Sequence, residues 1–464
     1  METAKVAGSD IIKWVAIVVI TLFSLLLPTT EIITVQMKMF VTITIFYLAL
    51  IALEVVDILL VSALLPATYL VFGVADATTV FSPWLSTTIY MVMGAFVLAA
   101  ILQDCGLLER IAYMLMSKIG SSYYKLIIGL YLVGIVITII TFGNGYIIMG
   151  ALGLGLCLAL NFMNTKMSAI IGFACLIGGV SAKSFTYTAT AYGIIMNMSQ
   201  GLLTPETIAR ITPIKVMIDN LPLFFISLGI LLIAAKVYKP DSSVLGSKEY
   251  FREKLNGLGP VKREEKINLV LLLCIIAWMV TTKFHGKSMD FAFMIAPYLA
   301  FLPFVRSAKK ECLKTVNFSM LFFMAACMSI GTVATSLGVS KIVASLFEAI
   351  VAGNYSSLVF AFIFALIFIL NFLLTPVAIW GLITVPVLQL AINLGMDPIP
   401  FVYALLQSAE AIIFPYEYIP YLVFFGFGMM GMGDFIKLNL MRCIIYFLGI
   451  IVILVPWWEL IGIL

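Results

Sequence analysis

Apolar runs of membrane-spanning length fill this sequence, and one of them is interrupted at its middle by polar residues. Residues 178–193 read Gly-Gly-Val-Ser-Ala-Lys-Ser-Phe-Thr-Tyr-Thr-Ala-Thr-Ala-Tyr-Gly, between the apolar stretches 167–177 and 194–198. Neither flank alone crosses about 30 Å of hydrocarbon, but the flanks and the polar residues together do. We call 178–193 the first island and expect it at mid-membrane, where polar backbone must face protein or a water-lined cavity.

The composition indicates a membrane protein built from helices. Of its 464 residues 63% are hydrophobic and 11% charged, with a mean hydropathy of +1.16, whereas soluble domains have about 25% charged residues. A β-barrel would show short alternating segments, and this chain has unbroken apolar runs instead. The predicted fold class is an all-α polytopic membrane protein with about 11 transmembrane helices. The seven cysteines show no metal-ligand spacing and are interpreted as small hydrophobic residues.

A second polar stretch, 408–425, interrupts another apolar segment 232 residues after the first and contains Glu410 and Glu417. We call it the second island. At the same offset Gly106 aligns with Gly338. Chance matches are common in sequences rich in Leu and Ile, but here five unlike elements also recur in the same order. The sequence therefore predicts an internal duplication and a site built from both islands.

The recurring order defines the predicted domains. The first repeat, 1–237, comprises scaffold helices within 12–103, a surface helix at 106–118, a hairpin at 123–162, an interrupted helix at 167–200 and a span at 213–236. The second repeat, 267–464, comprises helices within 267–337, a surface helix at 338–351, a hairpin at 355–393, an interrupted helix at 398–433 and a span at 439–461. The charged segment 238–266 predicts a cytoplasmic linker.

Residues 123–162 fit either two full spans or a re-entrant hairpin. Two spans would need a polar connector outside the bilayer, and the turn Gly143-Asn144-Gly145 carries no charge, which favours the hairpin. With the N-terminus in the cytoplasm, most of the 27 Lys and Arg residues lie on the inner side, as the positive-inside rule requires. The two hairpins then open to opposite sides. Inverted repeats with interrupted helices are typical of alternating-access carriers.

With this order of elements, the chain resembles the divalent anion/sodium symporter family of di- and tricarboxylate carriers, and more loosely the superfamily of arsenite and citrate carriers. The likeness covers nearly the whole chain. Locally, Ile177-Gly178-Gly179 followed by Thr186 resembles the family's Gly-Gly and Gly-Thr-Pro-Pro-Asn loop, and 414–426 resembles its Ala-Thr-Pro-Pro-Asn counterpart.

The resemblance implies a homodimer that works by elevator-type alternating access, with hairpins and interrupted helices moving against a scaffold. It also implies a prokaryotic inner membrane as location. The implied partners are a small anionic substrate, the lipid bilayer and a second copy of the chain, with no nucleic acid. The only implied cofactor is sodium.

The chain departs from the family at the hairpin tips, where relatives carry Ser-Asn-Thr to bind carboxylate and help cage sodium. The first tip keeps only Asn144, and the second reads Leu374-Thr375-Pro376. Where the family loops are neutral, this chain has Lys183 and Glu417. We therefore expect no cofactor. We expect sodium-independent exchange or uniport in which the Lys183 ammonium supplies the positive charge that attracts the anion, and proton coupling through Glu417 is the alternative.

The candidate substrate-binding residues lie at the hairpin tips or in the islands. Ordinary roles compete for each: an Asn-Gly turn, hydroxyls that satisfy helix carbonyls, and tyrosines at the membrane interface. A charge in hydrocarbon is costly, so a paired or functional role is the default for Lys183 and Glu417. We expect the two to approach one another or a shared anion and to behave as a unit. The candidates are Gly143, Asn144, Gly145, Ser181, Lys183, Ser184, Thr186, Thr188, Thr375, Pro376, Glu417, Tyr418 and Tyr421.

Together these features predict a secondary transporter of small organic anions, di- or tricarboxylates, and not an enzyme. Two alternatives stay open. One is a sodium- or proton-coupled symporter of another oxyanion such as sulfate. The other is a membrane-embedded enzyme that uses Glu410 and Glu417 as acid and base. No Walker loop and no His-Glu-x-x-His motif is present in the sequence, which argues against a pump or an intramembrane metalloprotease.

Overall fold

The computed structural model describes residues 8–30, 33–53, 55–119, 122–143, 145–159, 161–163, 165–239, 247–281, 285, 287, 290–316, 318–351, 356–372 and 374–464. These residues form helices, and the β-structure among them is a single isolated bridge between Gln200 and Leu203. The predicted all-α class is confirmed.

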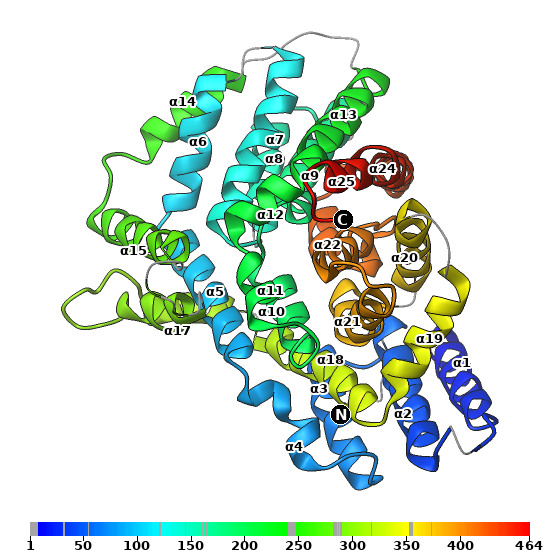
Figure 1. Cartoon of the computed structure of the whole chain (residues 1–464). Helices are drawn as coiled ribbons and strands as arrows, with labels where there is room; N and C mark the ends of the chain where they lie inside the picture. Colours follow the sequence, from blue (N-terminus) through cyan, green and yellow to red (C-terminus); the bar gives the residue numbers. More distant parts are fainter. Residues whose placement is uncertain are drawn as a thin grey trace. The chain divides into compact units, whose positions relative to one another are not determined.

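The helices of the first half follow the predicted order closely (Figure 1). Two predicted single elements are divided: the interrupted helix becomes two helices joined by a 3-10 turn, and the span at 213–236 becomes two helices. The elements are α1 (Gly8–Ser24), α2 (Val35–Ala52), α3 (Ile58–Val71), α4 (Ala77–Val80), η1 (Ser82–Leu85), α5 (Thr87–Asp104), α6 (Leu107–Ile119), α7 (Tyr123–Ile140), α8 (Tyr146–Ala159), α9 (Lys166–Gly179), η2 (Ser181–Ser184), α10 (Ala189–Met198), α11 (Pro205–Arg210), α12 (Pro213–Asp219) and α13 (Leu221–Val237).

The described part of the second half is also helical. The predicted linker contains a helix, α14 (Ser247–Gly257), which packs on α6. The remaining elements are α15 (Arg263–Val280), α17 (Asp290–Leu299), η3 (Lys310–Thr315), α18 (Phe318–Ser336), α19 (Val339–Val351), α20 (Ser356–Asn371), α21 (Pro376–Asn393), α22 (Pro398–Ala409), η4 (Pro415–Glu417), α23 (Ile419–Gly426), α24 (Met432–Gly449), the π-helical turn η5 (Ile450–Leu454) and α25 (Val455–Leu460).

Among the described residues, six helical stretches are long and apolar enough to cross a membrane. A seventh is added if α12 and α13, bent by 60° relative to each other, form one span. Shorter apolar helices of 10–17 residues accompany them. Two of these are α8, which begins after the predicted first hairpin tip, and α20, which ends before the predicted second tip. The long stretches are Thr87–Asp104, Tyr123–Ile140, Lys166–Met198, Phe318–Ser336, Pro376–Asn393 and Met432–Leu460.

The chain divides into two compact units that interleave along the sequence. Unit 1 comprises Met1–Ile89, Ile194–Leu203 and Phe318–Leu405; unit 2 comprises Tyr90–Gly193, Thr204–Asn317 and Leu406–Leu464. The predicted repeats are consecutive halves instead. Because compactness and duplication are different properties, the repeat boundaries and their inverted relation stay predictions.

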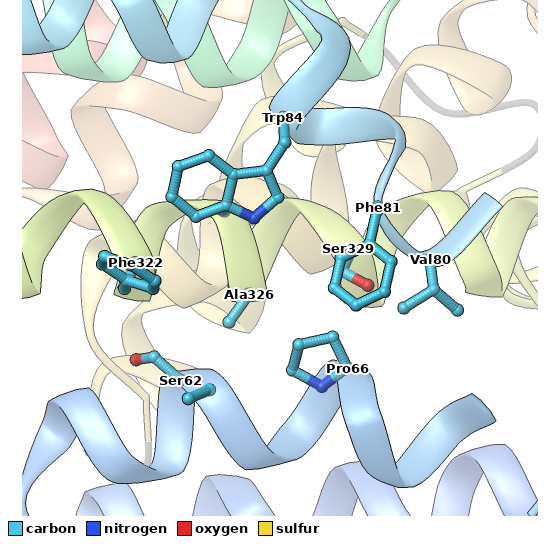
Figure 2. A pocket seen from close by; sticks show the side chains of 10 residues that line it. Ser62, Pro66, Val80, Phe81, Trp84, Phe322, Ala326 and Ser329 are labelled. Atoms are coloured by element: carbon cyan, nitrogen blue, oxygen red, sulfur yellow. The ribbon is translucent and has the colours of Figure 1, made fainter. Parts of the chain in front are cut away.

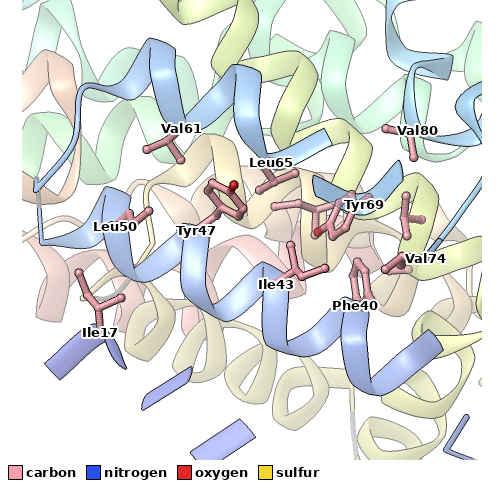
Figure 3. Packing of buried hydrophobic residues seen from close by; sticks show 13 residues of the cluster. Ile17, Phe40, Ile43, Tyr47, Leu50, Val61, Leu65, Tyr69, Val74 and Val80 are labelled. Carbon is pink, nitrogen blue, oxygen red and sulfur yellow. The ribbon is translucent and has the colours of Figure 1, made fainter. Parts of the chain in front are cut away.

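The core of unit 1 forms where α2 and α3 lie side by side (Figure 3). Phe40 and Tyr69 have ring centroids 5.6 Å apart, and the Tyr69 hydroxyl bonds to the Thr44 hydroxyl. That bond satisfies a polar group that would otherwise be costly to bury. Ile330 and Val333 of α18 complete the same core, which joins the first helices of the chain to the second half.

In unit 2, α7 and α9 approach each other backbone to backbone. A Cβ added to Gly178 would lie 2.7 Å from the carbonyl oxygen of Tyr131 and 3.0 Å from the Cα of Gly134. The Thr138 hydroxyl donates to the Gly178 carbonyl at 3.0 Å. Small residues permit this approach, as they do between membrane helices generally. The contact holds the first hairpin against the interrupted helix.

We expect Gly178→Ala to destabilise the protein by about 1–3 kcal/mol, because the added methyl must displace backbone atoms of α7. Gly229→Ala is the matched control, since nothing lies within 4 Å of a Cβ there; in that helix alanine is expected to be neutral or to stabilise by about 0.5–1 kcal/mol. Thermal unfolding of the two purified variants measures the difference. Equal stability of both variants would contradict the close packing.

Candidate functional site

The first island breaks α9 from α10 within unit 2. The chain leaves α9 after Gly179, forms the 3-10 turn η2, and resumes helix at Ala189. The Ser184 hydroxyl donates to the Ser181 carbonyl at 2.7 Å, and the Thr186 hydroxyl to the Ala182 carbonyl at 2.8 Å. These two hydroxyls therefore hold the broken backbone together, which is the ordinary role that competed with substrate binding.

The second island also breaks its helix, in the stretch between α22 and α23. Both carboxylate oxygens of Glu417 accept backbone N–H groups, from Ile413 at 3.2 Å and Phe414 at 2.9 Å. Glu417 stands at the third position of η4, where a glutamate can reach back to satisfy the unpaired N–H groups at a helix start. Its carboxylate is thus occupied by the loop itself.

The two islands meet, as the sequence predicted. The Lys183 ammonium donates to the Tyr418 hydroxyl at 3.2 Å and lies 4.9 Å from the centre of the Tyr418 ring. The Ser181 and Tyr421 hydroxyls are 3.1 Å apart. All four side chains are buried, and Lys183 is only 9% exposed. A further ring, that of Tyr146 on α8, lies 5.9 Å from the ammonium.

The first hairpin tip approaches the same ammonium. A Cβ on Gly143 would lie 3.0 Å from Thr188 Cγ2 and 3.7 Å from Lys183 Cε, and Gly143 has a φ of +102°. Both the backbone conformation and the space therefore require glycine. Gly145 packs equally closely on Thr138. Asn144 lies outside the described residues.

Arg442, on α24, was missed by the sequence analysis. Its guanidinium donates to the carbonyls of Glu410 and Ile412, both at 3.0 Å, and to the Ser181 hydroxyl at 3.2 Å. It also donates to Asn439 at 3.2 Å. Arg442 is 3% exposed and binds one residue of the first island and the break of the second. A lone arginine within the apolar segment 439–461 was the available signal.

The structure does not show the direct approach of Lys183 to Glu417, and their approach to a shared anion stays a prediction. Among the described residues no ion pair joins them, because the Glu417 carboxylate is occupied by backbone N–H groups. The carboxylate that interacts electrostatically with Lys183 is that of Glu410, which is 2% exposed. The sequence analysis places Glu410 in the second island and gives it a role only in the enzyme alternative.

Two predicted site residues, Thr375 and Pro376, belong to unit 1. They start α21: the Thr375 hydroxyl accepts from the Ala378 N–H at 3.4 Å, and Pro376 takes the first helical position, where its missing N–H costs nothing. This is the geometry of an ordinary helix cap. Their role in substrate binding stays a prediction.

Unit 1 also contains cavities. One of about 160 Å³ lies between α3, η1 and α18, where Trp84 and Phe322 have ring centroids 5.0 Å apart (Figure 2). Another of about 610 Å³ is lined by uncharged polar side chains, among them Asn197, Gln200 and Thr332. Neither contains a predicted site residue or a charged side chain in its lining, so neither matches the chemistry expected of an anion site.

The island junction of unit 2, by contrast, has the chemistry to bind a small anion. An ammonium can donate three hydrogen bonds, and Lys183 makes one to the described residues. The Thr188 hydroxyl, beside the hairpin tip, is buried without a hydrogen-bond partner there. Buried polar groups are nearly always satisfied, so such exceptions require an explanation. A bound anion would satisfy both.

Comparisons with known proteins identify the family of the chain. The model of the CitMHS citrate transporter family matches residues 48–406. The sodium-dependent dicarboxylate transporter SdcS of Staphylococcus saprophyticus is 26% identical over 273 residues, 54% of this chain and 51% of that protein. SdcS of Staphylococcus aureus strain MW2 is also 26% identical over 273 residues, 53% and 51% of the two chains. The chain thus spans about half the length of the curated relatives that it matches.

Among solved structures, the YdaH transporter of Alcanivorax borkumensis, described as having an unusual topology, superposes with a TM-score of 0.55. The match covers 83% of this chain and 88% of that one at 16% identity, so it supports the fold alone. The family match covers more than half of the chain. This chain is therefore an integral membrane protein that belongs to the CitMHS citrate transporter family.

Proposed function

We propose that this protein carries small organic anions, di- or tricarboxylates, across the membrane by alternating access. The observation that carries the proposal is the buried Lys183 ammonium at the junction of the two islands. A buried cation is costly unless a partner compensates it, and a substrate carboxylate is such a partner. The substrate class follows the family and the named activity of its dicarboxylate-transporting relatives.

In this proposal Lys183 supplies the charge that attracts the anion, and Thr188 supplies a hydroxyl. Gly143 and Gly145 let the hairpin tip approach, and Asn144 is a candidate on sequence alone. Tyr418 and Tyr421 hold Lys183 and Ser181 in place. Ser184, Thr186 and Glu417 keep the interrupted backbone in shape, and Thr375 and Pro376 form the start of a second hairpin arm.

We further propose that transport does not require sodium. The curated relatives are named for sodium dependence, and in the resembling family the hairpin tips help to cage the ion. Here the fixed ammonium of Lys183 would provide the positive charge instead. The alternative is a sodium- or proton-coupled symporter, of carboxylates or of another oxyanion such as sulfate.

Thermal unfolding of the purified protein with a panel of anions tests the substrate class. A ligand that binds only the folded state stabilises it by RT ln(1 + L/Kd), where L is the free ligand concentration, and so raises the unfolding temperature. We expect succinate or citrate to stabilise the protein equally well in sodium and in choline salts. Stabilisation by sulfate alone would favour the other oxyanion, and no stabilisation by any anion would contradict the proposal.

The elevator mechanism, the homodimer, and the location in a prokaryotic inner membrane with a cytoplasmic N-terminus are part of the same proposal. They rest on the resemblance and on the distribution of Lys and Arg. Cysteine crosslinking in native membranes tests the dimer. Monomers alone, at every position tried, would contradict it.

A further inference from the structure

Glu410 is the least satisfied charged group that the structure describes. It directly follows α22, is 2% exposed, and neither of its carboxylate oxygens has a hydrogen-bond partner among the described residues. Glu417, seven residues later, has donors for both oxygens. A buried carboxylate without donors bears its full desolvation cost. Such a group requires an explanation that the backbone of the loop does not supply.

Two cations interact electrostatically with Glu410, and they differ in their freedom. Arg442 is committed by four hydrogen bonds, one of them to the main-chain carbonyl of Glu410 itself. Lys183 makes one hydrogen bond, to Tyr418, and is the cation with donors to spare. Uncharged at neutral pH, the phenols of Tyr418, Tyr421 and Tyr446 are the other titratable groups that sense the Glu410 charge.

Within the part of the chain that the structure describes, Glu410 takes part in no ion pair shorter than 4 Å. Among the described residues, the Lys183 ammonium, bonded to Tyr418, and the Glu410 carboxylate therefore lie buried without an ion pair between them. Each carries a charge that the other can compensate, and an anion bound to Lys183 would take the place of the carboxylate.

We propose that Glu410 is an internal counter-anion, which neutralises Lys183 when no substrate is bound. On binding, Glu410 yields Lys183 to the substrate carboxylate, and Arg442 remains as the cation that acts on Glu410. An uncompensated charge at membrane depth is costly. With Glu410, the substrate-free site stays close to neutral and can reorient from one side of the membrane to the other. Without Glu410, only the substrate-bound site can reorient. Glu410 thus determines whether the carrier performs net transport or only exchange. This inference rests on the proposed function.

The test compares two modes of transport in proteoliposomes, with radiolabelled succinate or citrate as the probe, whichever the wild type carries. Exchange uses liposomes loaded with the unlabelled anion, and net uptake uses liposomes without it. We expect Glu410→Gln to keep exchange within about threefold of wild type and to lose net uptake at least tenfold. The exposed Glu459→Gln on α25 is the matched control and should change neither mode.

Glu410→Asp keeps the negative charge, so it allows the inference to be tested even if the Glu410→Gln protein does not fold. Its ratio of net uptake to exchange should stay within about threefold of wild type, and a tenfold loss of that ratio in a folded Asp variant overturns the inference. Equal loss of both modes in Glu410→Gln, or loss of neither, also overturns it. Net uptake that persists in Glu410→Gln but no longer responds to pH would identify a proton carrier instead.

A wild-type protein that exchanges but never shows net uptake overturns the inference and leaves the proposed function intact. A wild-type protein that transports no anion in either mode contradicts the proposed function itself. The two failures are therefore distinguishable in one set of liposomes.

Discussion

Replacing Lys183 by alanine is expected to abolish anion transport. The ammonium is buried, and the one hydrogen bond that it makes to the described residues is to Tyr418, so it has donors left for an anion. Truncating one partner of a buried, hydrogen-bonded charge pair costs about 2–5 kcal/mol, which is roughly a 30- to 5000-fold loss of affinity. Uptake of radiolabelled succinate or citrate by proteoliposomes measures the effect.

The matched control is Lys166→Ala, at the exposed start of the same interrupted helix. It removes an equal charge from the surface and should leave uptake within about twofold of wild type, because exposed charges contribute about 1 kcal/mol or less. Both variants must first unfold at temperatures close to that of wild type. A folded Lys183→Ala protein with normal uptake would mean that the anion binds elsewhere.

Replacing Arg442 by methionine is expected to have the largest effect on stability. The guanidinium donates to two carbonyls at the break of the second island and to Ser181 in the first. Its loss would leave these buried acceptors unpaired, at a cost of about 1–3 kcal/mol in the free energy of unfolding for each group left unsatisfied. Arg442→Lys should recover only part of that, because a single ammonium cannot present donors in a fork.

Lys437→Met, on the exposed face of α24, is the control for Arg442. It should change the unfolding temperature little, since exposed substitutions usually stay within about 0.5 kcal/mol. Thermal unfolding of the purified proteins separates the two positions. An Arg442→Met protein as stable as the Lys437 variant would show that the arginine does not hold the two islands together.

The sequence was most informative about which segments are helical and which are interrupted. Length, hydropathy and the polar islands predicted that the helices at 167–200 and 398–433 are interrupted, as α9 with α10 and α22 with α23 are, although α23 ends seven residues before 433. These properties are local, because hydrogen bonding within the helix and the cost of polar groups in hydrocarbon act on neighbouring residues. The charged segment 238–266 was predicted as a linker, yet it contains α14, whose packing on α6 no local pattern could predict.

The side-chain partners were less predictable, because they depend on contacts between distant residues. The offset of 232 placed Lys183 near Glu417, but the local N–H groups of Ile413 and Phe414 compete for that carboxylate and occupy it. Arg442 reaches Ser181 across 261 residues of sequence. A lone arginine in an apolar segment indicates a buried partner, but only the fold identifies which one.

The central claim is that a fixed ammonium replaces sodium in gathering the anion, and uptake in sodium-free medium tests it most directly. Wild-type proteoliposomes are given radiolabelled succinate or citrate in sodium chloride and in choline chloride. We predict initial rates within about twofold of each other, because the charge of Lys183 is present in both media. Uptake that requires sodium, together with a folded Lys183→Ala variant that still transports, would contradict the account.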